Sequence, residues 1–262
     1  MDVSMSSLNH VLSDFVQYLE NERDAGRGMV EVPVEVLNEL GVMPKKATVP
    51  VSKEAVKIAS LHRQVNHEHL PGTTGLEEIK ASIAACKKCS LHKSRTNVVP
   101  GQGSVSPEIM FVGEAPGADE DLQGLAFVGR AGQLLTKMIE AMGYKREEVF
   151  IGNILKCRPP DNRPQMPDEM EVCLPFLKAQ IAVIKPKVII ALGSTAVKGL
   201  LNLTTGITKL RGKWLSFEGI DLMPTYHPAY LLRNPPAKKE VWDDLQEVLR
   251  HLGRTPPPVK KR

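Results

Sequence analysis

The sequence predicts an α/β protein in which a four-stranded parallel sheet is covered by helices on both faces. Four short apolar runs of strand length alternate along the chain with longer segments whose apolar residues recur at helical spacing. Gly143 ends one of these helical segments, Pro167 begins another, and Ser194 is expected to cap a third. The strands are expected at residues 108–114, 148–156, 186–193 and 220–228, and the helices at residues 75–86, 132–143, 167–185, 194–202 and 238–253.

The chain divides into three parts. Residues 1–75 lack this alternation and contain one amphipathic segment, between Leu8 and Leu19, with linker-like stretches after it. We interpret this N-terminal extension as a partly helical arm that docks an unknown protein. Residues 76–252 carry the regular pattern and form the predicted domain, and residues 253–262 form a basic, proline-rich tail.

Composition and charge are those of a soluble globular protein with a mildly basic body. The chain has 262 residues, of which 42% are hydrophobic and 24% charged, and a formal net charge of +4. Residues 1–75 hold 7 Lys and Arg against 10 Asp and Glu, so the positive excess lies in the rest of the chain and suits a polyanionic partner. No apolar run approaches the roughly 20 residues that span a bilayer, and residues 1–15 lack the features of a secretory signal. We expect a cytoplasmic monomer without membrane contact.

Three polar residues follow predicted strands. Glu114 ends the first apolar run and precedes a turn of small residues, Asn153 lies near the end of the second run, and His227 lies near the end of the fourth. Parallel strands bring their carboxyl ends to one edge of a sheet, and ligands bind there. We therefore expect these three side chains to meet at that edge.

Four cysteines form two spaced pairs: Cys86 and Cys89 as C-x2-C, and Cys157 and Cys173 as C-x15-C. The first spacing lets two thiolates bind one centre, whereas the second is loose for a zinc ribbon. Four thiolates also suit a [4Fe–4S] cluster. The spacing alone leaves the cluster, a zinc ion and scattered buried thiols open.

Several motifs together resemble the family 4 uracil-DNA glycosylases. They are "GEAPGADED", "FVGRAGQLL", "NILKCRPPDNRP" and "YHPAYLLRNP", in this order along residues 76–250, with the four cysteines at matching spacing. The resemblance implies a three-layer α/β/α fold around a four-stranded parallel sheet, a structural [4Fe–4S] cluster on the four cysteines, and removal of uracil from double- or single-stranded DNA. It does not cover the N-terminal extension.

The resemblance also implies a uracil-binding set: Gly113, Ala115, Phe127, Asn153 and His227. The amide of Asn153 offers an acceptor and a donor, which match uracil N3–H and O4 and mismatch cytosine. Phe127 is expected to stack on the flipped base. A neutral His227 would suffice to donate a hydrogen bond to uracil O2.

Two acids compete for the task of positioning the hydrolytic water. Related glycosylases often have Asp or Asn at the position of Ala115, which has no functional group here. Glu114 and Glu120 both match acids of the motif. We favour Glu114 as the water-positioning carboxylate and Glu120 as a wall of the pocket or an assisting acid.

DNA contacts are expected mainly from the last motif. Leu231, favoured over Leu232, is expected to fill the gap left by the flipped base, and Arg233 to bind phosphate. Further phosphate contacts are expected from Arg130, Lys156, Arg158, Arg163 and Arg211. The segment after Cys157 lacks the histidine of relatives that crosslink to abasic sites, so free turnover is expected.

Three other functions are compatible with parts of this pattern. An iron–sulfur redox protein would share the cysteines, but it would have no use for the "HPAYLLRNP" motif. A DNA-binding module with an inactive pocket would share the motifs but would not release a base. A zinc protein would share the cysteine pairs and contain no iron.

Overall fold

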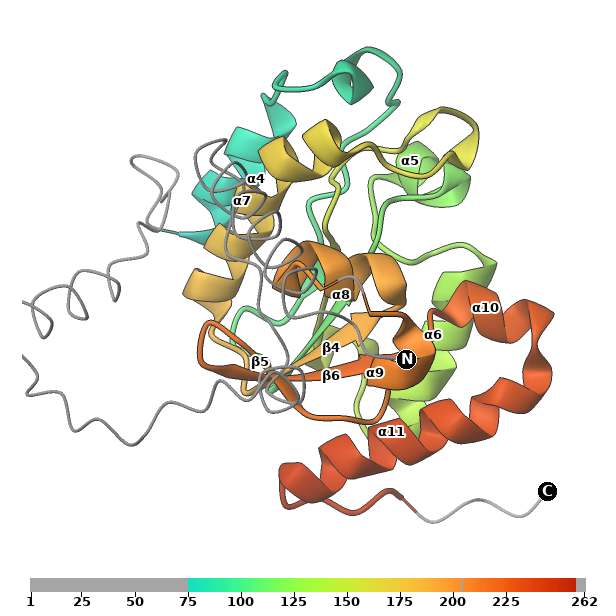
Figure 1. The fold of residues 1–262 in the computed structure, drawn as a ribbon. Helices are drawn as coiled ribbons and strands as arrows, with labels where there is room; N and C mark the ends of the chain where they lie inside the picture. The colour runs from blue at the N-terminus through green and yellow to red at the C-terminus, as the bar shows by residue number, and fades with distance from the viewer. Residues whose placement is uncertain (1–74, 204, 258–262) are drawn as a thin grey trace, which may run out of the picture. The chain divides into compact units, whose positions relative to one another are not determined.

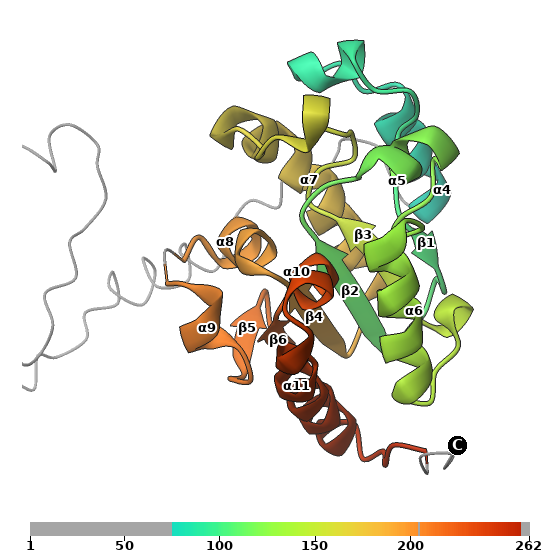
Figure 2. The same ribbon diagram turned by 90° about the vertical axis from the view of Figure 1, so that its right-hand side faces the viewer.

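The computed structural model describes residues 75–203 and 205–257. The predicted helix between Leu8 and Leu19, and with it the docking role of the N-terminal extension, lies outside the described residues. Among the described residues, no helix is long and apolar enough to cross a membrane. These residues form a sheet that is flanked by helices (Figures 1 and 2).

The sheet has six strands in the order β1-β3-β2-β4-β6-β5. Its four inner strands are parallel and correspond to the four predicted strands, so the predicted parallel sheet is confirmed. The short edge strands β1 and β5 pair antiparallel with their neighbours and were not predicted. The bounds are β1 (Gln102–Gly103), β2 (Ile109–Gly113), β3 (Phe150–Asn153), β4 (Val188–Leu192), β5 (Leu215–Phe217) and β6 (Ile220–Thr225).

Long helices cover both faces of the sheet, as the sequence predicts. One face is covered by α4 (Leu76–Ala84), α7 (Pro167–Ile184) and α8 (Ser194–Leu201), and the other by α6 (Arg130–Ala141) and α11 (Lys238–His251). Shorter helical segments are α5 (Ala118–Gln123), α9 (Ile207–Leu210) and α10 (Pro228–Arg233), with 3-10 turns η1 (Ser90–Lys93), η2 (Arg146–Glu148), η3 (Pro160–Asn162) and η4 (Pro235–Ala237).

One detail of α8 differs from the prediction. Ser194 is its first helical residue, and the N-cap is Gly193, whose φ of 88° places it in the left-handed region. Because Gly193 has no side chain, no side-chain hydrogen bond caps this helix. Gly193 accommodates the sharp passage from β4 into α8, which a residue with a Cβ would resist.

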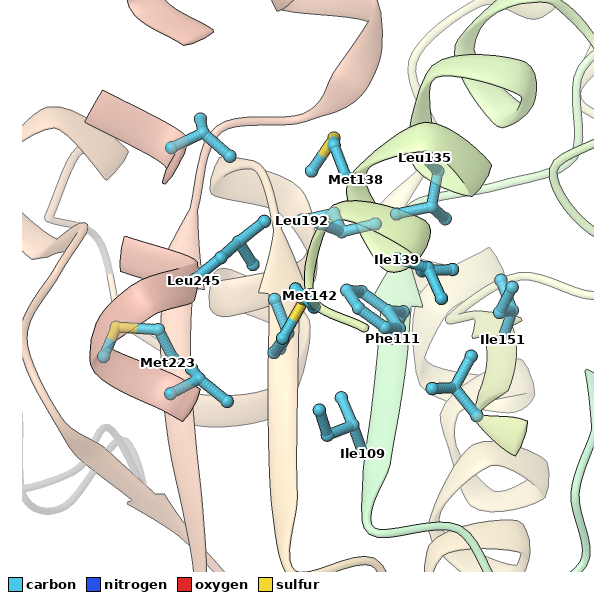
Figure 3. Close-up of a cluster of buried hydrophobic side chains, with 14 of the residues drawn as sticks. Ile109, Phe111, Leu135, Met138, Ile139, Met142, Ile151, Leu192, Met223 and Leu245 are labelled. Atoms are coloured by element: carbon cyan, nitrogen blue, oxygen red, sulfur yellow. The ribbon is translucent and has the colours of Figure 1, made fainter. Parts of the chain in front are cut away.

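Side chains of β2 alternate between two cores. Ile109 and Phe111 belong to the cluster that includes Leu135 and Ile139 of α6, and Figure 3 shows this cluster. Met110 and Val112 belong to the cluster on the opposite face, with α4, α7 and α8. All residues of this strand are buried, as expected for a central strand of a sheet that is covered on both faces. Burial on both faces fixes the register of the sheet, and with it the positions of the strand ends.

Candidate active site

A cavity of about 560 Å³ lies at the carboxyl ends of the inner strands. Glu114, Asn153 and His227 all line it, so the three strand-end residues meet as the sequence predicts. Ala115, Glu120 and Phe127 contribute further walls, and two arginines, Arg163 and Arg233, line it as well.

Backbone pairing sets Glu114 beside Asn153. In the register of β2 and β3, Gly113 is the partner of Asn153. Two hydrogen bonds continue the pairing beyond these strand ends, from Ile154 N to Gly113 O and from Leu155 N to Glu114 O, each 3.0 Å long. The relative positions of the carboxylate and the amide are therefore fixed by main-chain atoms.

The amide of Asn153 faces the cavity without a partner. The residue is only 2% exposed, and its Oδ1 is buried and accepts no hydrogen bond from the described residues. A buried acceptor without a donor is costly, so a hydrogen-bond donor to this atom would remove an unfavourable contribution. Gly113 provides the space in front of it, since a Cβ there would lie 2.4 Å from this Oδ1 and 2.5 Å from Phe127 Cζ.

His227 is held as a neutral hydrogen-bond donor. It is the N-cap of α10, where its Nδ1 accepts a hydrogen bond from Ala229 N at 3.2 Å. The proton of the neutral ring is therefore on Nε2. Burial, and next to it the charge of Arg233, lowers the pKa of His227 to about 4. The ring of Phe127 lies nearby, with 5.7 Å between the ring centroids.

The two candidate acids have different surroundings. The carboxylate of Glu120 accepts three backbone hydrogen bonds, from Gly117 N, Val128 N and Gly129 N, at 2.8 to 3.1 Å. The carboxylate of Glu114 has no hydrogen bond or ion pair with the described residues. Glu120 therefore holds the turns around the cavity, whereas Glu114 has free oxygens at the cavity wall.

The predicted phosphate contacts divide into free and engaged cations. Arg130 and Arg233 are exposed and form no hydrogen bond or ion pair within the described part of the chain. Arg158 is partly exposed, and its Nε donates to Asn162 Oδ1 at 2.8 Å. Arg163 forms a two-bond ion pair with the buried carboxylate of Glu169, at 2.9 and 2.5 Å.

Of two further predicted phosphate contacts, Lys156 is wrong and Arg211 is engaged within the protein. Lys156 is 1% exposed, and its Nζ donates to Asn153 O at 2.8 Å and to Gln180 Oε1 at 2.7 Å. Arg211 is paired with Asp244, whose Oδ1 lies 2.6 Å from its Nη2. A buried cation is not available to a phosphate on the surface, whereas the phosphate contacts of the ion-paired Arg163 and Arg211 stay predictions.

Leu231 also differs from its prediction. It is 1% exposed and belongs to the hydrophobic core, whereas its neighbour Leu232 is 38% exposed. The reason is the helical spacing of α10, in which Pro228 and Leu231 are three residues apart and face inward together. Leu231 therefore packs α10 onto the domain, and Leu232 is the apolar side chain available at the surface.

Comparison with known proteins identifies the family. The sequence profile described as the Uracil DNA glycosylase superfamily matches residues 100–246, more than half of the chain. This chain belongs to the uracil-DNA glycosylase superfamily. The matched residues include the whole cavity and two of the four cysteines, Cys157 and Cys173.

Relatives within this superfamily are type-4 uracil-DNA glycosylases. The protein of Sulfurisphaera tokodaii is 48% identical over 190 residues, which cover 69% of this chain and 86% of the relative. The protein of Archaeoglobus fulgidus is 43% identical over 190 residues, covering 70% and 96%. That of Thermotoga maritima is 48% identical over 163 residues, covering 61% and 84%. These identities place the chain in the type-4 group of the superfamily.

The four cysteines of this glycosylase-superfamily member line a second, small cavity. Cys86 follows α4, Cys89 precedes η1, Cys157 follows β3 and Cys173 lies in α7, so residues far apart in sequence meet here. Arg95 Nη1 lies 3.1 Å from Cys157 Sγ, and Lys156 N lies 3.3 Å from Cys173 Sγ. The cavity thus combines four thiols with donors that favour negative sulfur.

The four thiols share one cavity, and burial affects protonation there. Among residues 75–203 and 205–257, no three His, Cys, Asp or Glu side chains are grouped as ligands of one ion. Burial raises the pKa of Cys173 to about 12 and also raises the pKa values of Cys89 and Cys157. Four cysteines at one cavity are a ligand set that both a zinc ion and an iron–sulfur cluster use.

Several cavity residues of this glycosylase fold were not predicted. Tyr230 lines the cavity and is 38% exposed, and its ring lies 4.8 Å from that of Tyr226. Pro159 and Asn162 line it from the loop after Cys157. All three lie inside motifs that the sequence singled out, so position within a motif was the signal that could have found them.

We predict that the imidazole of His227 remains neutral, with its proton on Nε2, throughout the neutral pH range. The folded protein takes up a proton here only as the pH falls toward about 4, whereas the unfolded chain does so near 6.5. The stability that this difference contributes is present above pH 6.5 and is lost as the pH falls toward 4. Nitrogen NMR of ¹⁵N-histidine-labelled protein, assigned with His227→Gln, measures the pKa and the tautomer. A pKa near 6.5, or a proton on Nδ1, would contradict the prediction.

Proposed function

We propose that this protein is a DNA-repair glycosylase that hydrolyses the bond between uracil and deoxyribose in DNA and leaves an abasic site. The observation that carries the proposal is the unpartnered amide of Asn153 in a cavity that also presents a neutral histidine donor. The type-4 relatives, at 43% to 48% identity, support the same substrate.

Uracil recognition follows from the hydrogen-bonding groups of Asn153. Its Oδ1 accepts from uracil N3–H, and its Nδ2 donates to uracil O4. Cytosine presents an unprotonated N3 and an amino group at these two positions, so both contacts become mismatches. Phe127 supplies a flat apolar surface for the base, and Gly113 leaves room for it.

Bond cleavage moves negative charge onto the base. The Nε2–H of His227 donates to uracil O2, and this hydrogen bond strengthens as charge develops. Because the ring is neutral, it stabilises the leaving base without placing a buried cation beside the positive sugar. Main-chain contacts hold the ring in place before the reaction, so little reorganisation is needed.

Water must reach the sugar carbon from the opposite side. The free carboxylate of Glu114 orients this water and stabilises the positive charge of the sugar. Glu120 has its oxygens occupied by backbone N–H groups, so it acts by holding the turns that carry the other residues.

DNA approaches over the open face of the cavity. Arg130 and Arg233 bind phosphates there, and their contribution weakens as salt rises. Leu232, exposed at the end of α10, takes the role of filling the gap left by the flipped nucleotide.

We further propose that the four cysteines hold a [4Fe–4S] cluster with a structural role. Their number, their common cavity and the adjacent cations Arg95 and Lys156 support this assignment. The cluster, when bound, links α4, η1, α7 and the loop after β3 and takes no part in the reaction. That loop continues to Pro159, Asn162 and Arg163 at the wall of the uracil cavity.

The first test measures base release. Wild-type protein is expected to release uracil from a duplex with one uracil, and no cytosine from the matched cytosine duplex. Asn153→Asp should lower the uracil-to-cytosine ratio, because a carboxyl group presents a different set of donors and acceptors. Alkaline cleavage of the abasic strand quantifies both reactions.

Two results would contradict the proposal in different ways. Absence of uracil release by wild-type protein would remove the proposed activity. Unchanged selectivity in Asn153→Asp, with wild-type activity intact, would remove only the recognition role of this amide.

The two carboxylates should separate in single-turnover kinetics. Glu114→Gln should slow base release by ~10²–10⁴-fold, in the range of general-base contributions. Glu120→Gln retains an acceptor oxygen, and it should lower the melting temperature while slowing release less. Rapid-quench assays at saturating enzyme measure the rates, and calorimetry measures the melting temperature. The reverse order of rate losses would exchange the two roles.

Metal content tests the cysteine site independently of activity. Protein purified without oxygen should contain about four iron and four sulfide per chain, and Cys157→Ala should lose most of both. Met142→Ala is the matched control, because Met142 is a buried sulfur residue in the core on the other face of the sheet. It should lower stability and keep the iron. Zinc in place of iron, or full iron content in Cys157→Ala, would refute the cluster.

A further inference from the structure

Phe127 has a backbone conformation that is unfavourable for a residue with a side chain. Its φ is 52°, in the left-handed region, although it is not glycine and its side chain is 94% buried by surrounding residues, with 6% exposed. This conformation is unfavourable for an L-residue and persists only where neighbouring groups enforce it. The groups that enforce it also determine where the aromatic ring of the cavity lies.

Arg146 holds the carbonyl side of this residue. Its Nη2 donates to Ala126 O at 2.6 Å and to Phe127 O at 2.9 Å, and its Nη1 donates to Thr136 Oγ1 at 2.9 Å. The guanidinium forms no ion pair with the described residues, and burial lowers the pKa of Arg146. Its hydrogen-bonding capacity is directed at two carbonyls and a hydroxyl in the protein, so it is not a free phosphate contact.

Two further groups hold the loop that contains Phe127. The carboxylate of Glu120 accepts from Val128 N and Gly129 N, directly after Phe127. The first turn of α6 presses against the carbonyl, since a Cβ on Gly132 would lie 1.9 Å from Phe127 O. Three contacts therefore hold the loop. Arg146 binds its carbonyl oxygens, Glu120 binds its N–H groups, and the first turn of α6 lies close to it because Gly132 has no side chain.

We propose that Arg146 is a positioning residue that fixes Phe127 for stacking on the flipped base; this inference rests on the proposed glycosylase function. Arg146 begins η2, which leads directly into β3 and so to Asn153 at the end of that strand. One side chain therefore ties the stacking residue to the segment that carries the recognition amide. Without it, Phe127 O loses its donor and Ala126 O keeps only the longer hydrogen bond from Gln102 Nε2, at 3.3 Å. Phe127 then relaxes toward negative φ, and its ring leaves the place where it meets the base.

The test is a double-mutant cycle on the single-turnover rate of uracil release. Arg146→Met is made in the wild-type protein and in Phe127→Ala. It should slow the wild-type enzyme by about 10-fold or more, the loss expected for hydrogen bonds from a charged donor. In Phe127→Ala the same change should slow release by less than about twofold, because no ring remains to be positioned. Arg146→Lys, which retains a cation, should restore part of the rate.

Arg254→Met is the matched control. Arg254 is likewise an arginine engaged within the protein, but its partners are the carboxylate of Glu108 and the ring of Tyr144, outside the uracil cavity. Its loss should leave the rate unchanged. If Arg146→Met does not fold, Arg146→Lys is carried through the same two backgrounds, because it keeps the charge and changes the geometry of the donors. Its loss of rate should likewise shrink in Phe127→Ala, and an equal loss in both backgrounds would overturn the positioning role.

The outcomes separate this inference from the proposed function. Wild-type protein that releases no uracil would refute the function itself. If wild-type protein is active, a wild-type rate in Arg146→Met would overturn the positioning role. An equal loss in both backgrounds would also overturn it, because Arg146 would then act on stability or on another group rather than through Phe127.

Discussion

Two main-chain hydrogen bonds, which extend the pairing of β2 and β3 past the last strand residues, determine the geometry on which the site depends. They place Glu114 beside Asn153 with no freedom beyond the side-chain rotamers. The equivalent pairing of β4 with β6 brings the chain to His227 on the other side of the cavity. A sheet buried on both faces cannot shift its register without exposing its core. The pattern of apolar residues in the strands therefore also sets the distances between Glu114, Asn153 and His227, which lie at the strand ends.

The charged groups at the cavity differ in what their charge acts on. Arg233 lines the cavity, and its charge helps to keep His227 unprotonated. Glu120 uses its charge on backbone N–H groups, which leaves Glu114 as the carboxylate with free oxygens. The same residue types therefore contribute either to structure or to chemistry, depending on whether the fold has already supplied them with partners.

The sequence was sufficient for the elements and for the meeting of the strand ends, because both follow from apolar periodicity and parallel topology. It was insufficient where two neighbouring residues of similar type divide between core and surface. Leu231 and Leu232 are such a pair, and only the start of α10 at Pro228 decides which one faces inward. The prediction that Lys156 binds phosphate was wrong for a related reason, since its hydrogen-bond partner Gln180 lies 24 residues away in α7. The left-handed Phe127 and its contact with Arg146 have no signal in composition or spacing.

The loop from Cys157 to Arg163 contributes to the walls of two cavities. Its first residue lines the cysteine cavity, while Pro159, Asn162 and Arg163 line the larger cavity at the strand ends. Asp161 and Asn162 both have positive φ, so the backbone of this turn is held in a conformation that resists stretching of the loop. On the proposal that these cysteines hold a cluster, oxidation at Cys157 frees one end of a loop whose other end, at Arg163, lines the larger cavity. Exposure to air is then expected to alter the wall of that cavity from a distance of six residues along the chain.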